Sequence, residues 1–347
     1  MSSSSTLVSQ IKAQAQVLGF DTVGVARVHP STLDVTPLSD LKRSESNSLP
    51  LTTRLWNRLT HWLEQRYHGT MLWMERDPQR RADPTKVLPG CQSMIVVGMN
   101  YYTDHVPDET HQAGRIARYA WGNDYHDFMK NRLKELEEFI HQQIPGIQTR
   151  SYVDTGPIME KAWAQEAGIG WIGKHTNVVS TSYGSWLLLG EILTTQELEP
   201  DVAASDLCGS CSLCIQACPT GAIIEPYQLD AERCISYLTI EHRGSISDIA
   251  PDLQKKMGNR IFGCDDCLDI CPFNVNAQPT LEAHFQPSSW TLHPPLSQLA
   301  SLSQKEFLAM TKGSPLRRPK YEGFVRNTQI ALQNQRPSPS STATQQS

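Results

Sequence analysis

Residues 208–219 read CGSCSLCIQACP, and the interpretation of the whole sequence starts from this stretch. Its spacing, C-x2-C-x2-C-x3-C-P, is that of bacterial two-cluster ferredoxins, in which three thiolates of the run hold one cubic 4Fe-4S cluster and the fourth reaches a neighbouring cluster. Eight of the nine cysteines lie between Cys208 and Cys271 of a 347-residue chain. This concentration predicts metal chemistry rather than a disulfide framework.

A second, incomplete run occupies residues 261–272, which read IFGCDDCLDICP. Ile261 stands where the first cysteine would be, and Cys234, isolated between the two runs, is available to replace it. Because the clusters of such ferredoxins exchange their fourth ligands, we expect two sets of four thiolates. The first set is Cys208, Cys211, Cys214 and Cys271, and the second set is Cys218, Cys234, Cys264 and Cys267. Two structural zinc sites are the alternative, but eight cysteines with two Cys-Pro endings favour iron.

The composition is that of a globular protein long enough for two or three domains, with 39% apolar and 19% charged residues. The 31 basic and 36 acidic residues give a net charge of −5, which argues against a protein that coats nucleic acid by bulk charge. No apolar stretch approaches the roughly 18 residues of a membrane helix, and the N-terminus lacks the features of a secretory signal. We therefore expect a cytoplasmic protein without membrane contact.

Strands and helices alternate over residues 1–200, which predicts an α/β (α+β) domain. The patterns indicate helices at 6–18, 124–143 and 159–167, strands at 20–28, 94–101 and 149–153, a surface loop at 29–50, and a hairpin that joins 177–180 to 185–193. The composition then changes, and we expect a two-cluster ferredoxin-like domain at 201–280, a short helical, repeat-like segment at 281–335 and a disordered tail at 336–347.

Residues 168–173 read GIGWIG and match the G-x-G-x-x-G pattern of dinucleotide-binding sites. In such a site the glycines follow a strand and open a helix. Here they follow the helix expected at 159–167 and lead into a strand. We therefore interpret them as a helix C-cap and a tight turn, not as a nicotinamide site.

Residues 154–160 read DTGPIME and lie between an expected strand and an expected helix, where α/β domains present catalytic groups. Asp154 is the first candidate for chemistry, and a helix N-cap is the alternative, because Asp is a favoured capping residue. Glu160, Lys161, Lys174 and His175 are equally compatible with ordinary solvated or hydrogen-bonded side chains. These residues alone leave both interpretations open.

Five segments carry a more specific signal. They read RYAWGNDYH at 118–126, VDTGPIME at 153–160, GIGWIGKH at 168–175, CISYLTIE at 234–241 and GNRIFGCDDC at 258–267. Together they resemble the epoxyqueuosine reductase family, the iron–sulfur and cobalamin enzymes of the last step in making the tRNA nucleoside queuosine. The resemblance extends from the first helix to about Leu332.

This resemblance implies a cobalamin between the α/β domain and the cluster domain, without a lower axial ligand from the protein, and it matches Asp154 to the family's proton donor. The residues implied to face the cobalamin are Arg81, Ala117, Asp154, Val178, Thr181, Leu189, Ser236, Cys264 and Asp265. Some relatives have a cysteine near the cobalt at position 117, where Ala117 supplies no thiol. Longer relatives continue into helical repeats that help hold the tRNA, so we expect a smaller RNA surface here.

The implied reaction reduces epoxyqueuosine to queuosine in a tRNA anticodon loop. It consumes two electrons and two protons and releases water. We expect an external low-potential donor to pass electrons through the two clusters to give cob(I)alamin, while Asp154 protonates the epoxide oxygen. For that role Asp154 must hold a proton near neutral pH, and burial would raise its pKa in that direction.

A basic segment at 305–326, with six basic and two acidic side chains, suits a phosphate-binding face, although such a run is more often a solvated helix. The expected tRNA contacts are Arg243, Arg317, Arg318 and Lys320. One alternative is another corrinoid iron–sulfur reductase of the reductive-dehalogenase kind, which usually carries a twin-arginine signal that is not present here. The other is a ferredoxin-type electron-transfer module, which would leave the first 200 residues without a task. We expect a monomer.

Overall fold

The computed structural model describes residues 3–29, 49–107 and 113–335. A four-stranded sheet in the order β1-β2-β7-β4 forms the centre of its N-terminal part, and every neighbouring pair is antiparallel. The strands are β1 (Thr22–Arg27), β2 (Ser93–Asn100), β7 (Leu187–Thr194) and β4 (Thr149–Tyr152). β2 is buried along its whole length, as the apolar run at 94–101 predicts.

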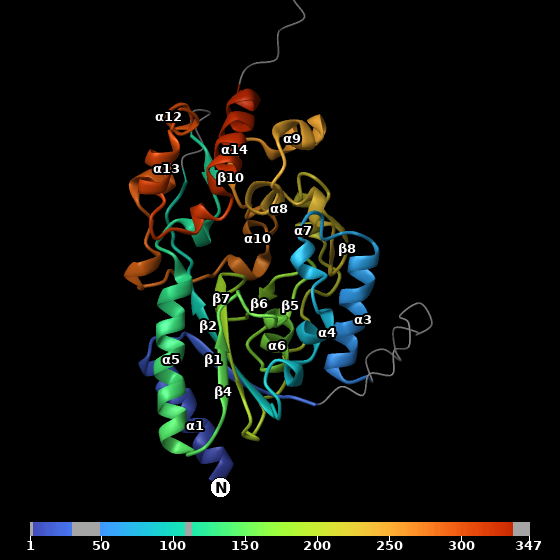
Figure 1. The fold of residues 1–347 in the computed structure, drawn as a ribbon, viewed down its shortest axis with the longest axis vertical. Helices are drawn as coiled ribbons and strands as arrows, with labels where there is room; N and C mark the ends of the chain where they lie inside the picture. Colours follow the sequence, from blue (N-terminus) through green and yellow to red (C-terminus); the bar gives the residue numbers. More distant parts are fainter. Residues whose placement is uncertain (1–2, 30–48, 108–112, 336–347) are drawn as a thin grey trace, which may run out of the picture.

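Helices cover both faces of this sheet (Figure 1). Met129, Leu133 and Leu136 are completely buried on one face, and Trp163 is buried on the other. The helices on the first face are α1 (Ser3–Val17) and α5 (Tyr125–Gln143), and those on the second face are α6 (Glu160–Glu166), α3 (Leu51–Glu64) and α4 (Pro78–Ala82). The mixed fold expected from the alternating patterns is confirmed, and its sheet is antiparallel.

The glycine motif ends α6, as expected. Gly168 has a φ of 75°, a left-handed conformation that suits glycine one residue beyond the C-cap. At Gly170 a Cβ atom would come within 2.3 Å of the Val179 carbonyl oxygen, so only glycine allows this close approach. The prediction of a helix C-cap and tight turn is confirmed.

The hairpin expected between 177–180 and 185–193 is wrong. β6 (Val178–Val179) pairs with β5 (Trp171–Ile172), and only an isolated bridge joins Ser180 to Gly184. β7 lies inside the four-stranded sheet, hydrogen-bonded to β2 on one edge and to β4 on the other. Because both edges of β7 are occupied, no edge is left for β6.

The cysteine-rich part lies beyond one end of the sheet and consists of short elements (Figure 1). They are α7 (Leu213–Ala217), β8 (Ile223–Glu225), β9 (Gln228–Leu229), α8 (Ile235–Ile240), α9 (Pro251–Met257), β10 (Arg260–Phe262) and α10 (Asp266–Asp269). β10 pairs in parallel with β3 (Arg115–Ile116), which lies far upstream in the sequence. Ile116, Ala120 and Trp121 thereby pack with the C-terminal part of the chain and not with the sheet.

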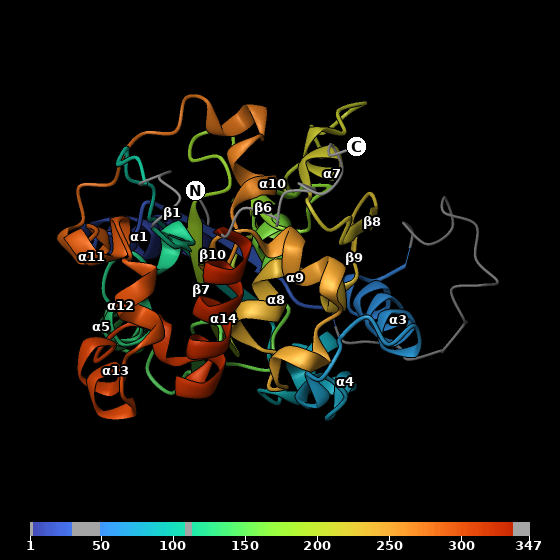
Figure 2. The ribbon, with the colours of Figure 1, turned by 90° about the horizontal axis from the view of Figure 1, so that it is seen from above.

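The last four α-helices of the described residues are α11 (Ser289–Leu292), α12 (Leu296–Ala300), α13 (Gln304–Met310) and α14 (Lys320–Gln335). α14 runs beside α8 and β10 (Figure 2). Arg326 of this helix is 5% exposed and donates hydrogen bonds to the carbonyl oxygens of Leu238, His242 and Gly244 at 2.6 to 2.9 Å. Asn327 donates to two further carbonyl oxygens. These bonds fasten α14 to the cysteine-rich part.

The described ranges contain no helix that is both long enough and apolar enough to cross a membrane. The loop expected at 29–50 and the tail expected at 336–347 fall almost entirely outside the described residues. α3 begins at Leu51, directly after the expected loop.

Candidate active site

The first thiol group lies on α7 and the segments beside α7 and α10. None of the nine cysteines forms a disulfide bond. Burial raises the pKa of the Cys214 thiol, and the neighbouring thiols of Cys208, Cys271 and Cys211 add to the rise. The structure therefore places Cys271 of the second run beside three cysteines of the first run.

The second thiol group combines both runs with the isolated cysteine. Burial raises the pKa of Cys267 well above its usual range, and Cys264, Cys234 and Cys218 are the thiols that act on it. The Ser236 hydroxyl, expected to face the cobalamin, hydrogen-bonds the Cys234 thiol. In each group one thiol responds to the other three that ligand exchange between two clusters predicts, and the two ligand sets stay a prediction from the sequence.

The glycine motif at 168–173 and the lysine that follows it contact the first thiol group. The Trp171 indole N–H donates to Cys208 Sγ at 3.4 Å. Lys174 Nζ donates to the carbonyl oxygens of Gly209 and Cys211 at 2.6 and 2.8 Å. Hydrogen bonds to ligand sulfurs help to set the reduction potential of a cluster. The spacing of the cysteines carries no signal for either Trp171 or Lys174.

Asp154 follows β4 in a left-handed backbone conformation, with a φ of 56°. The alternative interpretation as a helix N-cap is wrong, because α6 begins at Glu160 and Met159 occupies the capping position. Asp154 Oδ2 accepts a hydrogen bond from Tyr125 Oη at 3.1 Å and lies 3.4 Å from His126 Nε2. The carboxylate is therefore held by two side chains of α5.

The expectation of a raised pKa at Asp154 is wrong. A hydrogen bond with His126 lowers the pKa of Asp154, and this effect exceeds the opposite effect of burial. The Asp154 side chain is 59% exposed, which also favours the carboxylate. Burial alone would lower the pKa of His126, but hydrogen bonds with Asp124 and Asp154 raise it to about 9. Near neutral pH the proton of the pair therefore lies on His126.

Two further carboxyl groups lie within electrostatic reach of Asp154. Glu191 on β7 is 1% exposed, and its Oε2 atom has no hydrogen-bond partner among the described residues. Burial raises the pKa of Glu191 well above its usual range, and the nearby Glu160 adds to the rise. Burial also raises the pKa of Glu160, against the opposing charge of Lys161. An acidic residue inside the apolar run LLLGEILT is the signal that points to Glu191.

Tyr119 marks the place where three parts of the fold meet. Burial raises the pKa of Tyr119 far above its usual range, and the carboxylates of Asp154, Asp265 and Glu241 add to the rise. Asp154 comes from the sheet, Asp265 adjoins Cys264 of the second thiol group, and Glu241 follows α8. Asp154 and the second thiol group therefore both lie near Tyr119.

Three positions expected to face the cobalamin lie together beside Tyr119. Ala117, Cys264 and Asp265 line one small cavity of about 10 Å³. Asp265 Oδ2 accepts a hydrogen bond from the Arg118 backbone N–H at 2.7 Å, and burial raises the pKa of Asp265 to about 7. A Cβ atom on Gly263 would approach the Ala117 Cβ to 2.5 Å. The two chain segments are thus closely packed at Ala117.

The other expected cobalamin positions come from separate elements. Arg81 on α4 places its guanidinium 5.0 Å from the centre of the Trp73 ring, and burial lowers its pKa. Val178 and Leu189 belong to one hydrophobic cluster on the α6 side of the sheet. Thr181 is exposed in the turn after β6. Among these four positions, only Val178 and Leu189 pack in the same hydrophobic cluster.

Arg318 is a further charged side chain near Tyr119. Its Nε and Nη2 atoms donate to both carboxylate oxygens of Glu241 at 2.7 and 3.1 Å. Arg243 Nη2 lies 3.8 Å from the same carboxylate. The pKa of Arg318 is raised by this pairing and further by the charge of Asp154. Two of the expected tRNA contacts are therefore gathered around one carboxylate.

The basic segment that contains Arg318 is only partly available to a partner. Arg317 and Lys320 are exposed. Arg326, which the charge count of 305–326 includes, is buried and hydrogen-bonded to backbone carbonyls. That part of the expected phosphate-binding face is wrong, because the fold itself uses the charge of Arg326.

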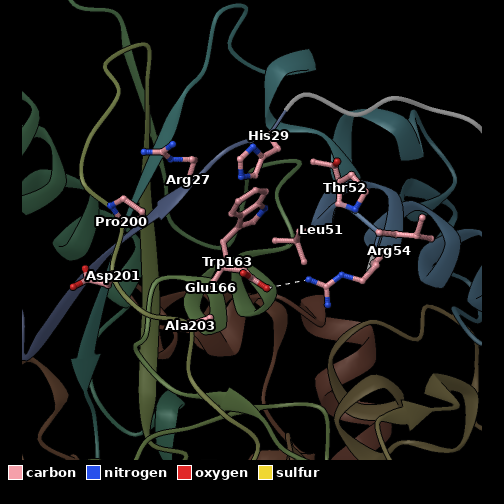
Figure 3. A pocket seen from close by; sticks show the side chains of 12 residues that line it. Arg27, His29, Leu51, Thr52, Arg54, Trp163, Glu166, Pro200, Asp201 and Ala203 are labelled. Carbon is pink, nitrogen blue, oxygen red and sulfur yellow. Dashed lines mark hydrogen bonds and ion pairs between the residues drawn. The ribbon is translucent and has the colours of Figure 1, made fainter. Parts of the chain in front are cut away.

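A separate cavity of about 290 Å³ lies between the end of β1, the start of α3 and α6 (Figure 3). Arg54 Nη2 and Glu166 Oε1 pair in its wall at 3.2 Å, and Trp163 forms another part of the wall. Within the described part of the chain, none of the site residues expected from the sequence lines this cavity.

Known proteins match both halves of this arrangement. Residues 81–155 match the family model "Epoxyqueuosine reductase QueG, DUF1730", and residues 207–274 match the model "4Fe-4S double cluster binding domain". The epoxyqueuosine reductase of Synechocystis sp. is 42% identical over 304 residues, which cover 87% of this chain and 100% of the relative. The chain belongs to the epoxyqueuosine reductase family. Its cysteine-rich part carries two 4Fe-4S clusters, which excludes the zinc alternative.

Other epoxyqueuosine reductases agree with this placement. The one from Escherichia coli is 40% identical over 332 residues, which cover 94% of this chain and 81% of the relative. A crystal structure of an epoxyqueuosine reductase with an epoxyqueuosine-modified tRNA-Tyr stem loop has a TM-score of 0.83 and 30% identity, over 95% of this chain and 82% of that one. The Bacillus subtilis epoxyqueuosine reductase with its catalytic aspartate loop swung out of the active site has a TM-score of 0.82 and 29% identity, over the same shares.

One segment that carries the epoxyqueuosine reductase resemblance has more roles than its sequence indicates. Residues 118–126 bind Asp265 through a backbone N–H, supply the tyrosine at the meeting point and provide the partners of Asp154. The contributing residues are Arg118, Tyr119, Asp124, Tyr125 and His126. A motif shared with the family was the only signal for them, because their partners lie elsewhere in the chain.

Proposed function

We propose that this chain reduces epoxyqueuosine to queuosine in the anticodon loop of a tRNA. The neighbourhood of Tyr119 carries this proposal, because Asp154, Asp265 beside the second thiol group, and Arg318 all lie within electrostatic reach of this residue. Removing the oxygen of an epoxide needs electrons, a proton at the departing oxygen and a surface that holds the substrate. The cysteine-rich part, the end of β4 and the C-terminal segment supply these three requirements.

The substrate assignment rests on a relative and on charge. An epoxyqueuosine reductase has been crystallised with an epoxyqueuosine-modified tRNA-Tyr stem loop. Arg317, Arg318 and Lys320 present three exposed positive charges on one segment, and Arg243 lies close to them through Glu241. Arginine and lysine bind RNA phosphates, so we assign these four residues to the RNA backbone.

The side chains fit the cofactors of the family. We assign the two thiol groups to two clusters, with Cys208, Cys211, Cys214 and Cys271 on one and Cys218, Cys234, Cys264 and Cys267 on the other. For cobalamin, Arg81 Nε and Glu191 Oε2 are buried polar atoms without a partner among the described residues, and the amide groups of a corrin can satisfy them. The residues that would hold it are Arg81, Ala117, Asp154, Val178, Thr181, Leu189, Ser236, Cys264 and Asp265. When bound, cobalamin and the clusters supply the two low-potential electrons.

The protein's own part in the chemistry is proton delivery and positioning. Asp154 Oδ2, oriented by Tyr125 and open to solvent on one side, protonates the oxygen that leaves the ring. The epoxide takes up two electrons and two protons and gives an alkene and water. The external low-potential donor, the monomeric state, the cytoplasmic location and the division into parts at 1–200, 201–280 and 281–335 stay predictions from the sequence.

Cofactor content and one substitution test this proposal together. Anaerobically purified, cobalamin-supplied protein should contain about eight iron atoms and about one cobalamin per chain. Asp154→Asn should keep both and lower turnover of epoxyqueuosine tRNA by at least about 100-fold, because a general acid contributes about 10²–10⁴ in rate. Asn also tolerates the left-handed backbone, and Asp127→Asn, at an exposed position on α5, is the control. Full activity of Asp154→Asn would remove Asp154 from the mechanism, and iron without cobalamin would favour an electron-transfer module.

A further inference from the structure

Three side chains form a continuous line between the start of α5 and the end of β4. Asp124 Oδ1 lies 2.6 Å from His126 Nδ1, and His126 Nε2 lies 3.4 Å from Asp154 Oδ2. Each nitrogen of the ring therefore meets a different carboxylate. An imidazole in this arrangement can pass a proton through one nitrogen while the carboxylate at the other nitrogen holds its orientation.

The line is fixed by the surrounding structure. Asp124 caps α5 by accepting from the His126 backbone N–H at 3.1 Å, and its carbonyl oxygen lies 2.9 Å from His284 Nε2. The His126 ring stacks on Tyr125 with 4.1 Å between ring centres and 25° between planes. Tyr125 Oη in turn donates to Asp154. The cap formed by Asp124, the stacking of His126 on Tyr125 and the hydrogen bond from Tyr125 to Asp154 together hold the imidazole in one orientation.

We propose that His126 is the proton reserve of the reaction, passing a proton from Nε2 to Asp154 Oδ2 and from there to the substrate oxygen, while Asp124 keeps the ring oriented. This inference rests on the proposed function. In each passage the Nε2–H bond breaks, an O–H bond forms at Asp154, and His126 is left neutral with its Nδ1–H toward Asp124. Two passages supply the two protons of one turnover, and the electrons come from the low-potential donor. His126 does not contact the substrate in this scheme. It acts through Asp154, by storing the proton and positioning it for transfer.

The charges and the exposure of the line agree with this role. With a lowered pKa at Asp154 and a pKa of about 9 at His126, the pair stores its proton on the ring at neutral pH. The His126 side chain is 31% exposed, so water can reprotonate it between the two passages. The other titratable or charged groups around the line are Tyr119, Tyr125, Glu160, Lys161, Glu191, His284 and Arg318.

The pH profile of single turnover on epoxyqueuosine tRNA separates a proton reserve from a merely structural histidine. The wild-type rate should be level near neutral pH and fall as the pH rises through about 9, because neutral His126 has no proton to pass. In His126→Gln the fall should begin in the acidic range, where Asp154 loses its own proton. The rate at pH 8 should then be about 100-fold below wild type and should recover toward acidic pH. His141→Gln, on the same helix with its ring on Thr149, should keep the wild-type profile.

A second measurement does not depend on turnover. In oxidised protein with isotope-labelled histidine, the NMR signal that is missing from His126→Gln should titrate near pH 9. Asp124→Asn and Asp154→Asn should each move this titration down toward the ordinary value of about 6.5. Iron and cobalamin contents, measured in every variant, identify protein that has failed to assemble.

Two results would overturn the inference: a wild-type His126 that titrates near 6.5, or a His126→Gln variant that loses activity equally at every pH while keeping its cofactors. A purely structural defect would lower the rate equally at every pH, because it does not depend on the charge of Asp154. If the wild type does not act on epoxyqueuosine tRNA, while His126 titrates near 9 and responds to both variants, the proposed function fails and the coupled proton line is supported.

Discussion

The two reactive regions of this molecule are assembled in opposite ways. In the cysteine-rich part, each expected cluster draws at least two ligands from one short run of the sequence, and short elements such as α7 and α10 hold them. In the acid region, Asp154 stands at the end of β4 and meets side chains that start α5 and precede α14. The comparison teaches that spacing identifies a metal ligand, whereas the protonation state of an acid depends on partners that spacing does not identify.

The largest expected effect comes from substituting two cysteines at a time. One pair belongs to the same cluster but to different runs, and the other pair belongs to the same run but to different clusters. Cys218 and Cys264 lie in different runs but are assigned to the same cluster. Cys218→Ser combined with Cys264→Ser should therefore cost only about four of about eight iron atoms per chain. Cys214→Ser combined with Cys218→Ser, two neighbours in one run, should cost nearly all the iron. Iron analysis of anaerobic protein measures the difference, and both double variants should lose turnover.

The matched control for these variants is Cys91→Ala. Cys91 is 3% exposed, and its pKa is raised by burial to about 11, so it behaves as a small core residue. This variant should keep all its iron. The reverse pattern would show that each run holds its own cluster without exchange of the fourth ligands: Cys218→Ser with Cys264→Ser would then cost nearly all the iron, and Cys214→Ser with Cys218→Ser only about half of it.

A smaller effect sharpens the acid side of the comparison. Arg318→Ala removes an exposed charge at the rim near Asp154 and should raise the KM for tRNA about tenfold, with kcat little changed. The slope of log affinity against log salt should fall by about one. Lys134→Ala, 74% exposed on α5, is the control and should change neither value. An unchanged KM in Arg318→Ala would place the RNA on another surface.

The smallest expected effect concerns the link between the sheet part and the first cluster. Trp171→Phe removes the N–H bond to Cys208 Sγ and should lower the potential of that cluster by roughly 40 mV, the equivalent of about 1 kcal/mol. Redox titration followed by EPR measures this shift. Trp163→Phe is the matched control, because the buried Trp163 Nε1 has no partner among the described residues. Equal potentials in the two variants would contradict a role of Trp171 in tuning the cluster.

Much of the fold could be predicted because it depends on local patterns. The apolar face at 124–143 and the apolar run at 94–101 correspond closely to α5 and β2. The hairpin prediction failed because the apolar pattern of β7 fits any antiparallel partner. The partners it takes in the fold, β2 and β4, lie far away in sequence.

The site, like the fold, has features that local sequence predicts and features that only the assembled fold determines. The presence of two clusters follows from the spacing of the cysteines, and the assignment of ligands to each cluster stays a prediction. Asp154 was identified by its place after a strand and by resemblance, but its ionisation was misjudged. Its exposure and the neighbouring imidazole of His126 are properties of the assembled fold. Tyr119 could not be assigned at all, since its importance comes from its burial among carboxylates of distant segments. Glu191 has a sequence signal in its apolar run, but its raised pKa depends on burial in the fold and on the nearby Glu160.

The buried guanidinium of Arg326 also sets an order of events during protein synthesis. The carbonyl groups of Leu238, His242 and Gly244 emerge from the ribosome more than 80 residues before the side chain that satisfies them. Until Arg326 arrives, these groups must stay hydrated, because burying them without a partner costs about 1–3 kcal/mol each. Most of the core of the sheet part comes from residues before 200 and can form earlier, as N-terminal domains generally do. The cysteine-rich part therefore closes only after Arg326 has emerged, so the time available for inserting its clusters extends at least to that point.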